Sequence, residues 1–377
     1  MHILFLSGEY PLWTSGGVGT FIQTLGRALV KAGHSVTVLG QGKEKEEVYL
    51  EDEGVKIYRL PKNTGKLPNF VFNAMQLNRK LKTLQKQQPI SIIESAEGGL
   101  AFLSKKHPAK KVIRLHGGHH FFAEAEKRAI NWRKGKLEKL SFAKANGFIA
   151  ISNYVKNHTE KYLSYRNKPV TIINLPVGVP SQQQECHVNP DRILFAGTIC
   201  EKKGVKELIE AFQLVKAKYP EKQLDLFGRE WFYPDGTTFE AELRNKFPKE
   251  YFENVHFHGA IPRAELDQKY AEAAFCVFPS HMETQGLVSV EAMALAKPVI
   301  FSQYGPGPET IEHGENGLLC DVYNPKDIAD NIIWCIEHSE EAKTLGEKGR
   351  TVVAEKYDPS SILQQNLDFY QSLLDTN

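Results

Sequence analysis

The segment from Ala274 to Ile300 constrains the fold more than any other part of the chain. An apolar run, Ala274 to Phe278, precedes Pro279-Ser280, which indicates a buried strand that ends in a loop. Small and apolar residues then extend from Leu287 to Leu295, and Lys297-Pro298 ends the predicted helix before the next apolar run. A strand, a loop, a tightly packed helix and a second strand in this order predict part of a parallel sheet.

Two carboxylates bracket the junction between this loop and the helix. Glu283 lies in the loop and Glu291 in the first turns of the helix, with seven residues between them. A helix N-terminus presents free N–H groups and a partial positive charge, which favour a phosphate. Carboxylates beside it can accept hydrogen bonds from sugar hydroxyls, so a sugar nucleotide suits both features. For such a pair in isolation, the alternative is two exposed glutamates, one of them a charge at the helix N-terminus.

The sequence of this segment resembles the Glu-x7-Glu motif of the family 4 retaining glycosyltransferases (group 1), which have the GT-B fold. The family motif runs Pro-Ser, Glu, Gly-Leu, Glu-Ala-Met-Ala and Pro-Val-Ile, and each part occurs between Pro279 and Ile300. The resemblance implies that Glu291 binds the ribose and Glu283 the hydroxyls of the donor sugar. Three backbone N–H groups would face the sugar and phosphates: those of Gln285, Gly286 and Leu287. Gln285 stands where the family usually carries Phe or Pro, a difference that bears on the sugar pocket.

A glycine-rich segment follows the first predicted strand, Ile3 to Leu6. The loop is Gly16 to Thr20, and a predicted helix separates it from a second strand at Ser35 to Leu39. A nicotinamide-binding enzyme is the rival interpretation, but the loop reads Gly-Gly-x-Gly and no carboxylate follows the second strand to bind a ribose. In the family resembled here, the equivalent loop closes over the donor phosphates, which gives that role to Gly16 and Gly17. A structural tight turn is the alternative.

Three histidines follow the strand predicted at Lys111 to Leu115. His116, His119 and His120 could suggest a metal site, but two of them are adjacent and no carboxylate completes a set. The family carries a histidine after this strand that reaches the donor sugar, and His116 matches it. A core or loop histidine without a role in function is the alternative.

Further donor contacts follow from the resemblance in the second half of the chain. The family reads Phe-Val-Gly-Arg-Leu and then Lys-Gly, where this chain has Phe195 to Ile199 and then Lys203-Gly204. Lys203 is expected to pair with the donor diphosphate, and Thr198 replaces the usual arginine. Ile261 lies in a turn that supplies backbone contacts to the base in the family. The chain has no Asp-x-Asp pair, so neither a divalent metal nor another cofactor is expected.

The length of 377 residues accommodates two domains of ordinary size. We expect an N-terminal Rossmann-like acceptor domain over residues 1–180, a polar linker over 181–190 and a C-terminal Rossmann-like donor domain over 191–360. The last helix, 361–377, is expected to pack back on the first domain. The predicted fold class is α/β of GT-B type, with two parallel-sheet domains that face a central cleft.

Composition narrows the cellular setting. The net charge of +2 is near balance, and five cysteines without paired spacing fit a reducing compartment: Cys186, Cys200, Cys276, Cys320 and Cys335. Met1 to Leu6 lacks the basic lead-in of a signal peptide, and no apolar run approaches the roughly 20 residues of a membrane span. A cytoplasmic protein is expected. The segment from Phe121 to Leu140 mixes aromatic and basic residues, which suits an anionic acceptor, peripheral contact with the anionic inner face of a membrane, or an ordinary solvated helix.

The resemblance covers nearly the whole chain and implies an enzyme. The expected reaction is metal-independent, retaining transfer of a sugar from a UDP- or GDP-sugar to a hydroxyl of a glycan, lipid-linked or surface-polysaccharide acceptor. Glu283, His116 and Lys203 are the expected catalytic residues, and no nucleic acid partner is expected. Two alternatives remain: a sugar-nucleotide 2-epimerase of the same fold, and an inactive sugar-nucleotide binder, which Thr198 and Gln285 motivate.

Overall fold

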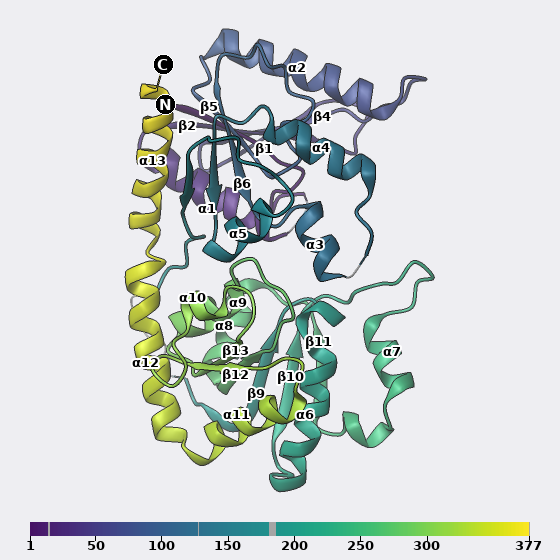
Figure 1. The fold of residues 1–377 in the computed structure, drawn as a ribbon, viewed down its shortest axis with the longest axis vertical. Helices are drawn as coiled ribbons and strands as arrows, with labels where there is room; N and C mark the ends of the chain where they lie inside the picture. The colour runs from purple at the N-terminus through teal and green to yellow at the C-terminus, as the bar shows by residue number, and fades with distance from the viewer. Residues whose placement is uncertain (14–15, 127, 181–185, 377) are drawn as a thin grey trace. The chain divides into compact units, whose positions relative to one another are not determined.

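The computed structural model describes residues 1–13, 16–126, 128–180 and 186–376. The chain forms two compact units (Figure 1). Unit 1 comprises Met1–Leu175 with Ser360–Asn377, and unit 2 comprises Pro176–Pro359. The last helix thus belongs to unit 1, and residues 176–180 belong to unit 2. Of the expected linker, residues 181–185 lie outside the described part of the chain.

The sheet of unit 1 has the strand order β3-β4-β2-β1-β5-β6-β7-β8. Its neighbouring strands are parallel except β3 and β4, which form an antiparallel hairpin at one edge. The interior strands β1 and β7 are buried along almost their whole length, which explains their nearly continuous apolar sequences. The strands are β1 (His2–Leu6), β2 (Ser35–Gln41), β3 (Val48–Asp52), β4 (Val55–Leu60), β5 (Ile92–Ser95), β6 (Lys110–Leu115), β7 (Gly147–Ala150) and β8 (Val170–Ile172).

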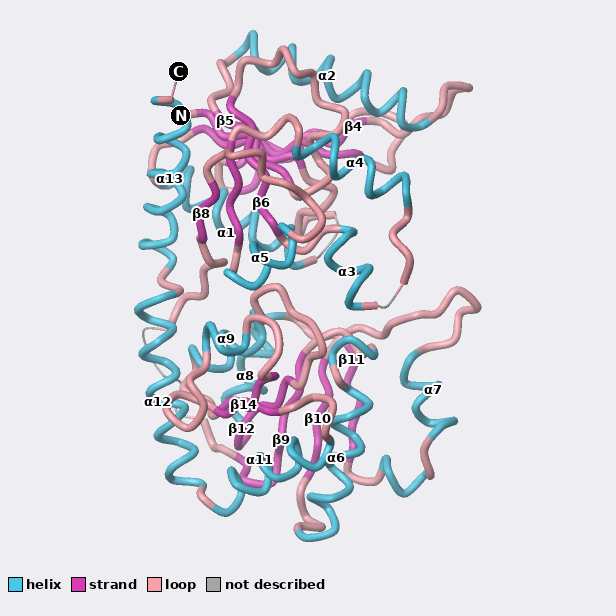
Figure 2. The backbone as a smooth tube through the Cα atoms, viewed as in Figure 1, coloured by secondary structure: helices cyan, strands magenta, loops and turns pink. Residues whose placement is uncertain are grey.

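Helices connect these strands and cover the sheet (Figure 2). They are α1 (Gly17–Lys31), α2 (Asn69–Gln87), α3 (His119–Ala125), α4 (Trp132–Phe142), α5 (Asn153–Glu160) and α13 (Pro359–Asp375). Two of them differ from the sequence expectation. The helix α1 begins at Gly17, directly after its N-cap residue Gly16. Most of the expected loop over Gly16–Thr20 is therefore helical. The segment Phe121–Leu140 forms parts of two helices, and Asn131 starts the second by accepting hydrogen bonds from the N–H groups of Arg133 and Lys134.

A buried polar network fixes α13 to the sheet of unit 1. The Arg114 guanidinium of β6 donates to Glu94 of β5 (Nε–Oε1, 2.7 Å) and to Asn366 of α13. The Tyr370 hydroxyl of α13 donates to the same carboxylate (2.7 Å). All four side chains are buried, so removal of Arg114 or of Glu94 would leave the other charge unpaired, which typically costs about 3–5 kcal/mol.

Unit 2 has a second, all-parallel sheet with the order β11-β10-β9-β12-β13-β14. Its strands are β9 (Asn189–Ala196), β10 (Gln223–Phe227), β11 (Val255–Gly259), β12 (Ala273–Phe278), β13 (Val299–Ser302) and β14 (Leu318–Cys320). Its helices are η1 (Glu201–Lys203), α6 (Val205–Lys218), α7 (Phe239–Lys246), η2 (Lys249–Phe252), α8 (Arg263–Glu272), α9 (Leu287–Ala294), α10 (Gly307–Thr310), α11 (Pro325–Glu337) and α12 (Ser339–Lys356). One hydrophobic core extends through the sheet and these helices. No helix in the described part of either unit is long and apolar enough to cross a bilayer.

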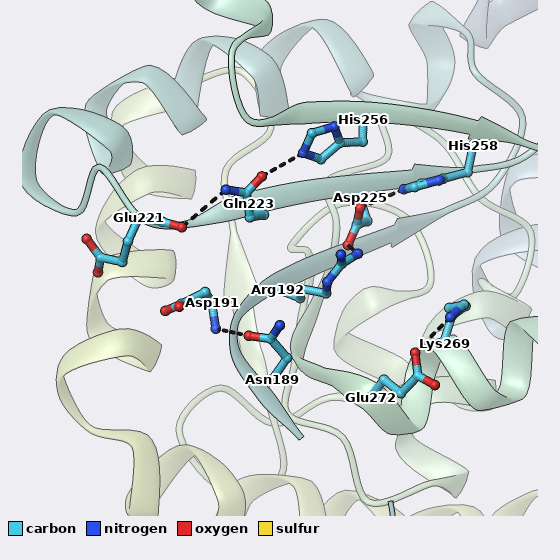
Figure 3. A network of polar contacts seen from close by, with 10 residues as sticks. All are labelled: Asn189, Asp191, Arg192, Glu221, Gln223, Asp225, His256, His258, Lys269 and Glu272. Atoms are coloured by element: carbon cyan, nitrogen blue, oxygen red, sulfur yellow. Dashed lines mark hydrogen bonds and ion pairs between the residues drawn. The ribbon is translucent and has the colours of Figure 1, made fainter. Parts of the chain in front are cut away.

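Polar side chains occupy one face of the sheet near its edge strand β11 (Figure 3). The buried Asp225 of β10 accepts from Arg192 of β9 (2.7 Å) and contacts the ring of His258 of β11 (2.6 Å). The ring of His256 contacts the side-chain oxygen of Gln223 (Nε2–Oε1, 2.6 Å). Charged and polar groups on an edge strand discourage pairing with the strands of another molecule. None of the residues drawn in this network belongs to the predicted donor site.

Candidate active site

Two loops of unit 2 meet at the carboxyl ends of neighbouring strands. The loop after β9 contains η1 and ends at Gly204, and the loop after β12 begins at Pro279. Gly204 has a φ of +69°, and a Cβ at this position would collide with the carbonyl oxygen of Pro279. The N–H of His281 donates to the carbonyl oxygen of Lys202 (3.0 Å). The close approach therefore requires glycine and brings two separate sequence motifs together.

The pairing of Lys203 with Glu283 is the central polar contact of these loops. The Lys203 ammonium forms an ion pair with Glu283 Oε1, and the Ser280 hydroxyl donates to the same oxygen (3.1 Å). The two charged side chains are only 18% and 12% exposed, so the pair is partly shielded from water. A cation suited to a phosphate and a carboxylate suited to a hydroxyl thus neutralise each other.

The helix α9 starts directly after the Glu283 loop. Gly286 is its N-cap with a φ of +77°, and a Cβ there would press into the ring of Phe301. The Ser289 hydroxyl donates a hydrogen bond to the carbonyl oxygen of this N-cap residue, Gly286 (2.7 Å). The first N–H groups of a helix have no partner within it, and here they belong to Leu287 and its neighbours. Gln285 is buried just before the cap, at the end of the loop.

Glu291 lies one turn further along α9 and is held by a cation from α8. Its carboxylate forms an ion pair with Arg263, whose Nε also donates to Asp267 (2.8 Å). Burial raises the pKa of Glu291, and the Arg263 guanidinium opposes that rise. A pocket of about 530 Å³ lies beside the pair, lined among others by Asp267 and Lys297. Ile261 lies in the turn before Arg263 and is partly exposed.

An exposed arginine lies next to Thr198, where the family usually has arginine. The Arg229 Nε is 3.4 Å from the Thr198 hydroxyl oxygen. Arg229 follows β10, and Thr198 follows β9; the two strands pair in parallel, with Phe227 beside Ala196. The sequence interpretation did not assign this residue to the site. The strand order would have revealed it, because the carboxyl ends of adjacent parallel strands share one edge.

The remaining predicted residues, Gly16, Gly17 and His116, belong to unit 1. His116 follows β6, and its ring lies 5.5 Å from that of Phe21 on α1, the helix that begins at Gly17. Burial, reinforced by the nearby Arg114 guanidinium, lowers the pKa of His116 to about 3. The imidazole is therefore neutral at physiological pH. It can donate or accept a hydrogen bond but contributes no charge.

Two buried carboxylates hold the loop after β6, and the sequence interpretation singled out neither. Glu97 accepts from the N–H of Gly117 (2.8 Å), and burial, with a smaller contribution from Glu138, raises the pKa of Glu97 to about 8. Glu138 of α4 binds the N–H groups of His119 and His120 and the ring of His120. These histidines therefore have structural partners. No group of three His, Cys, Asp or Glu residues in the described ranges could hold a metal ion.

Comparison with known proteins identifies the class. Residues 181–352 match the model of the glycosyl transferases group 1, and residues 15–179 match that of glycosyltransferase family 4. An uncharacterized glycosyltransferase of Methanocaldococcus jannaschii is 26% identical over 93% of this chain and 92% of its own length. An N-acetyl-alpha-D-glucosaminyl L-malate synthase of Bacillus anthracis is 28% identical, over 97% of this chain and 96% of its own.

Solved structures share the fold across the whole chain. A sucrose-phosphate synthase of Thermosynechococcus elongatus superposes with a TM-score of 0.83 at 21% identity and covers 100% of both chains. Anabaena HepE in complex with UDP and glucose gives a TM-score of 0.77 at 18% identity, over 99% of this chain and 100% of that one. Two Rossmann-like parallel-sheet units of this kind define the GT-B fold. The chain belongs to the glycosyl transferases of group 1, family 4, which confirms the predicted family and α/β fold class.

Proposed function

We propose that this enzyme transfers a sugar from a nucleoside diphosphate sugar to an acceptor hydroxyl, with retention at the anomeric carbon and without a metal ion. The observation that carries the proposal is the Lys203–Glu283 ion pair beside the N-terminus of α9. It brings a phosphate-binding cation, a sugar-binding carboxylate and free N–H groups to one edge of the sheet. Anabaena HepE, a structural relative, has been solved with UDP-glucose, and TarM with UDP. We therefore favour a UDP-sugar over a GDP-sugar as the donor.

In this proposal each donor group has its own partners. Lys203 and Arg229 bind the diphosphate together with the N–H groups of Gly286 and Leu287. Glu283 binds the sugar hydroxyls once the phosphate has taken Lys203 from it. Two further contacts would bind the rest of the nucleotide: Glu291 the ribose, and the backbone of Ile261 the base. Thr198 would contact the donor beside Arg229, and Gln285 would orient the N–H groups that follow it.

The proposed reaction is displacement on the front face of the donor sugar. The acceptor hydroxyl oxygen bonds to the anomeric carbon while the bond from that carbon to the phosphate oxygen breaks, and this phosphate oxygen takes the hydroxyl proton. Negative charge grows on the leaving diphosphate, where Lys203 and Arg229 would stabilise it. From unit 1, the neutral His116 would donate a hydrogen bond to the sugar. Gly16 and Gly17 would allow the backbone to approach the phosphates.

We assign the acceptor to unit 1 and the donor to unit 2. The acceptor class is a glycan, a lipid-linked sugar or a surface polysaccharide. All five cysteines are free, which fits the proposed cytoplasmic setting. Peripheral contact with an anionic membrane and the absence of a nucleic acid partner complete the proposal.

Incubation with UDP- and GDP-sugars, followed by NMR of the products, tests this function. We expect slow hydrolysis or transfer that gives products with the anomeric configuration of the donor. EDTA should leave the rate unchanged. An epimerised sugar nucleotide would identify a 2-epimerase, and binding without turnover would identify an inactive binder. Loss of turnover with EDTA that Mg²⁺ or Mn²⁺ restores would contradict metal independence.

A further inference from the structure

A short arm of unit 2 carries two neighbouring aromatic side chains that are open to solvent. It comprises residues 229–238, between β10 and α7, and we call it the β10–α7 arm (Figure 2). Trp231 is 45% exposed and Phe232 is 62% exposed. Burial of an aromatic ring removes a large apolar area from water. Two adjacent exposed rings therefore make the arm a candidate binding surface.

Backbone hydrogen bonds hold the arm in a defined shape. The N–H of Phe239 donates to the carbonyl oxygen of Trp231 (3.0 Å). One step further along, the N–H of Tyr233 donates to the carbonyl oxygen of Thr237 (2.9 Å). The Tyr233 hydroxyl also donates to Glu242 of α7. Because a paired segment presents the two rings, a ligand would lose little affinity to ordering of the arm.

The arm begins at the proposed donor site. Its first residue is Arg229, whose Nε is 3.4 Å from the Thr198 hydroxyl oxygen. The carbonyl oxygen of Arg229 accepts from the N–H of Ile199 (2.9 Å), which lies in the loop that leads to Lys203. Trp231 follows Arg229 by two positions. A ligand on the arm would therefore lie next to the donor.

The charge around the arm disfavours an anionic ligand. Residues 230–243 contain no lysine or arginine and four carboxylates: Glu230, Asp235, Glu240 and Glu242. The whole of unit 2 contains 19 lysines and arginines and 30 aspartates and glutamates, a formal net charge of −11. Unit 1 contains 28 and 15, a formal net charge of +13. A polyanion would be repelled from the arm, whereas the hydroxyl groups of a neutral sugar can donate to carboxylates.

We propose that the β10–α7 arm is a second carbohydrate site, which binds a neutral glycan. The C–H face of a pyranose would stack on Trp231, the larger ring, and Phe232 would add a second apolar contact. A second copy of the chain fits less well, because a stable interface takes about 800 Å² from each partner and two side chains supply only part of it. Glycan binding does not depend on the proposed transfer reaction. That this glycan is the acceptor does rest on it.

A glycan microarray probed with the full chain, in the absence of any donor, tests the proposal. It carries neutral cello-, malto- and N-acetylchito-oligosaccharides and acidic oligogalacturonates. We expect binding to neutral glycans and little binding to acidic ones. Calorimetric titration with the neutral glycan that binds most tightly should show about tenfold weaker binding for Trp231→Ala. Trp231→Tyr should restore most of the affinity because it keeps a ring, and Phe232→Ala should lose a few-fold.

The matched control comes from α6 of the same unit, where Leu214 is also exposed. Leu214→Ala should bind the glycan like the parent. Titration with UDP should give the same affinity in Trp231→Ala and in the parent, which separates this test from one of the donor site. Because no turnover is measured, a failure of sugar transfer would leave the result unchanged.

Four outcomes would overturn the proposal. The first two are no binding to any neutral glycan and tighter binding to the acidic ones. The third is an equal loss of glycan affinity in Leu214→Ala and Trp231→Ala. The fourth is a loss of UDP affinity in Trp231→Ala, which would assign this residue to the donor site. A parent that is dimeric in sedimentation velocity, with a monomeric Trp231→Ala variant, would contradict the proposal too and identify the arm as an interface between copies.

Discussion

Lys203 and Glu283 form an ion pair although 80 positions separate them in the sequence. They meet because β9 and β12 are neighbouring parallel strands, so the loops that follow these strands share one edge of the sheet. In our proposal the two groups bind different parts of the donor. Donor binding then exchanges partners: the diphosphate takes Lys203, and Glu283 becomes available to the sugar.

Lys203→Ala should weaken binding of UDP far more than Lys202→Ala does. A hydrogen bond to a charged group contributes about 1.5–3 kcal/mol, so the expected loss is on the order of 10- to 100-fold. Calorimetric titration measures it. The neighbouring Lys202 is the control because it lies in the same short helix, η1. A larger loss for Lys202→Ala would show that the wrong lysine has been assigned.

Arg229 should supply the cation that Thr198 does not. We expect Arg229→Ala to lower turnover and UDP affinity about tenfold, since it removes one charge-assisted contact to the diphosphate. Arg244→Ala is the matched control, because Arg244 is an exposed arginine of α7 paired with Glu240. Steady-state rates and UDP titrations compare the two. Parent-like behaviour of Arg229→Ala would remove this residue from the donor site.

Glu97 should make the stability of unit 1 depend on pH. Its pKa is raised to about 8 in the folded chain, whereas an unfolded glutamate titrates near 4.3. Between these values the folded state holds a proton that the unfolded state has lost, so stability falls as pH rises, by about 1.4 kcal/mol per pH unit at most. Below about pH 4 the carboxyl is protonated in both states, so its titration no longer changes the stability. The difference in thermal midpoint between Glu97→Gln and the parent should shift in favour of the variant as pH rises from 5 to 8. A difference that stays constant over this range would contradict the prediction.

Tyr370→Phe should destabilise the docking of α13. The substitution removes the hydroxyl that donates to the buried Glu94 carboxylate and leaves Arg114 and Asn366 in place. We expect a loss of about 1–3 kcal/mol, measured by thermal or urea unfolding. Tyr323→Phe is the control, because Tyr323 is an exposed tyrosine of unit 2. Equal effects of the two substitutions would show that the network does not hold the helix.

Motif positions were predictable from the sequence because local chemistry determines them. Strand β12, the break at Pro279 and the start of α9 at Leu287 each have a local signal, and they lie where the sequence predicts them. Contacts between motifs had no such signal. The pairing of Lys203 with Glu283 and the approach of Arg229 to Thr198 depend on the strand order β10-β9-β12, which a single sequence does not contain.

Burial and charge separation also escaped the sequence interpretation. Glu97 follows an ordinary strand, and only the fold shows that it is buried beneath the loop after β6. The break between α3 and α4 has a local cause, the capping Asn131, but basic residues on both sides concealed it. The opposite charges of the two units could have been counted from the expected domain boundaries, but the sequence interpretation considered only the total of +2, which averages them.

The central claim is that Glu283 and Glu291 bind different parts of the donor, and UDP titrations of Glu283→Gln and Glu291→Gln test it most directly. Glu291→Gln should lose about tenfold in UDP affinity with its ribose contact; Arg263 keeps Asp267 as a partner in this variant. Glu283→Gln should lose none and should gain a few-fold, because Lys203 no longer has a competing carboxylate. Its turnover should nevertheless fall, since the sugar is no longer held for attack. Equal losses of UDP affinity in both variants would contradict the assignment.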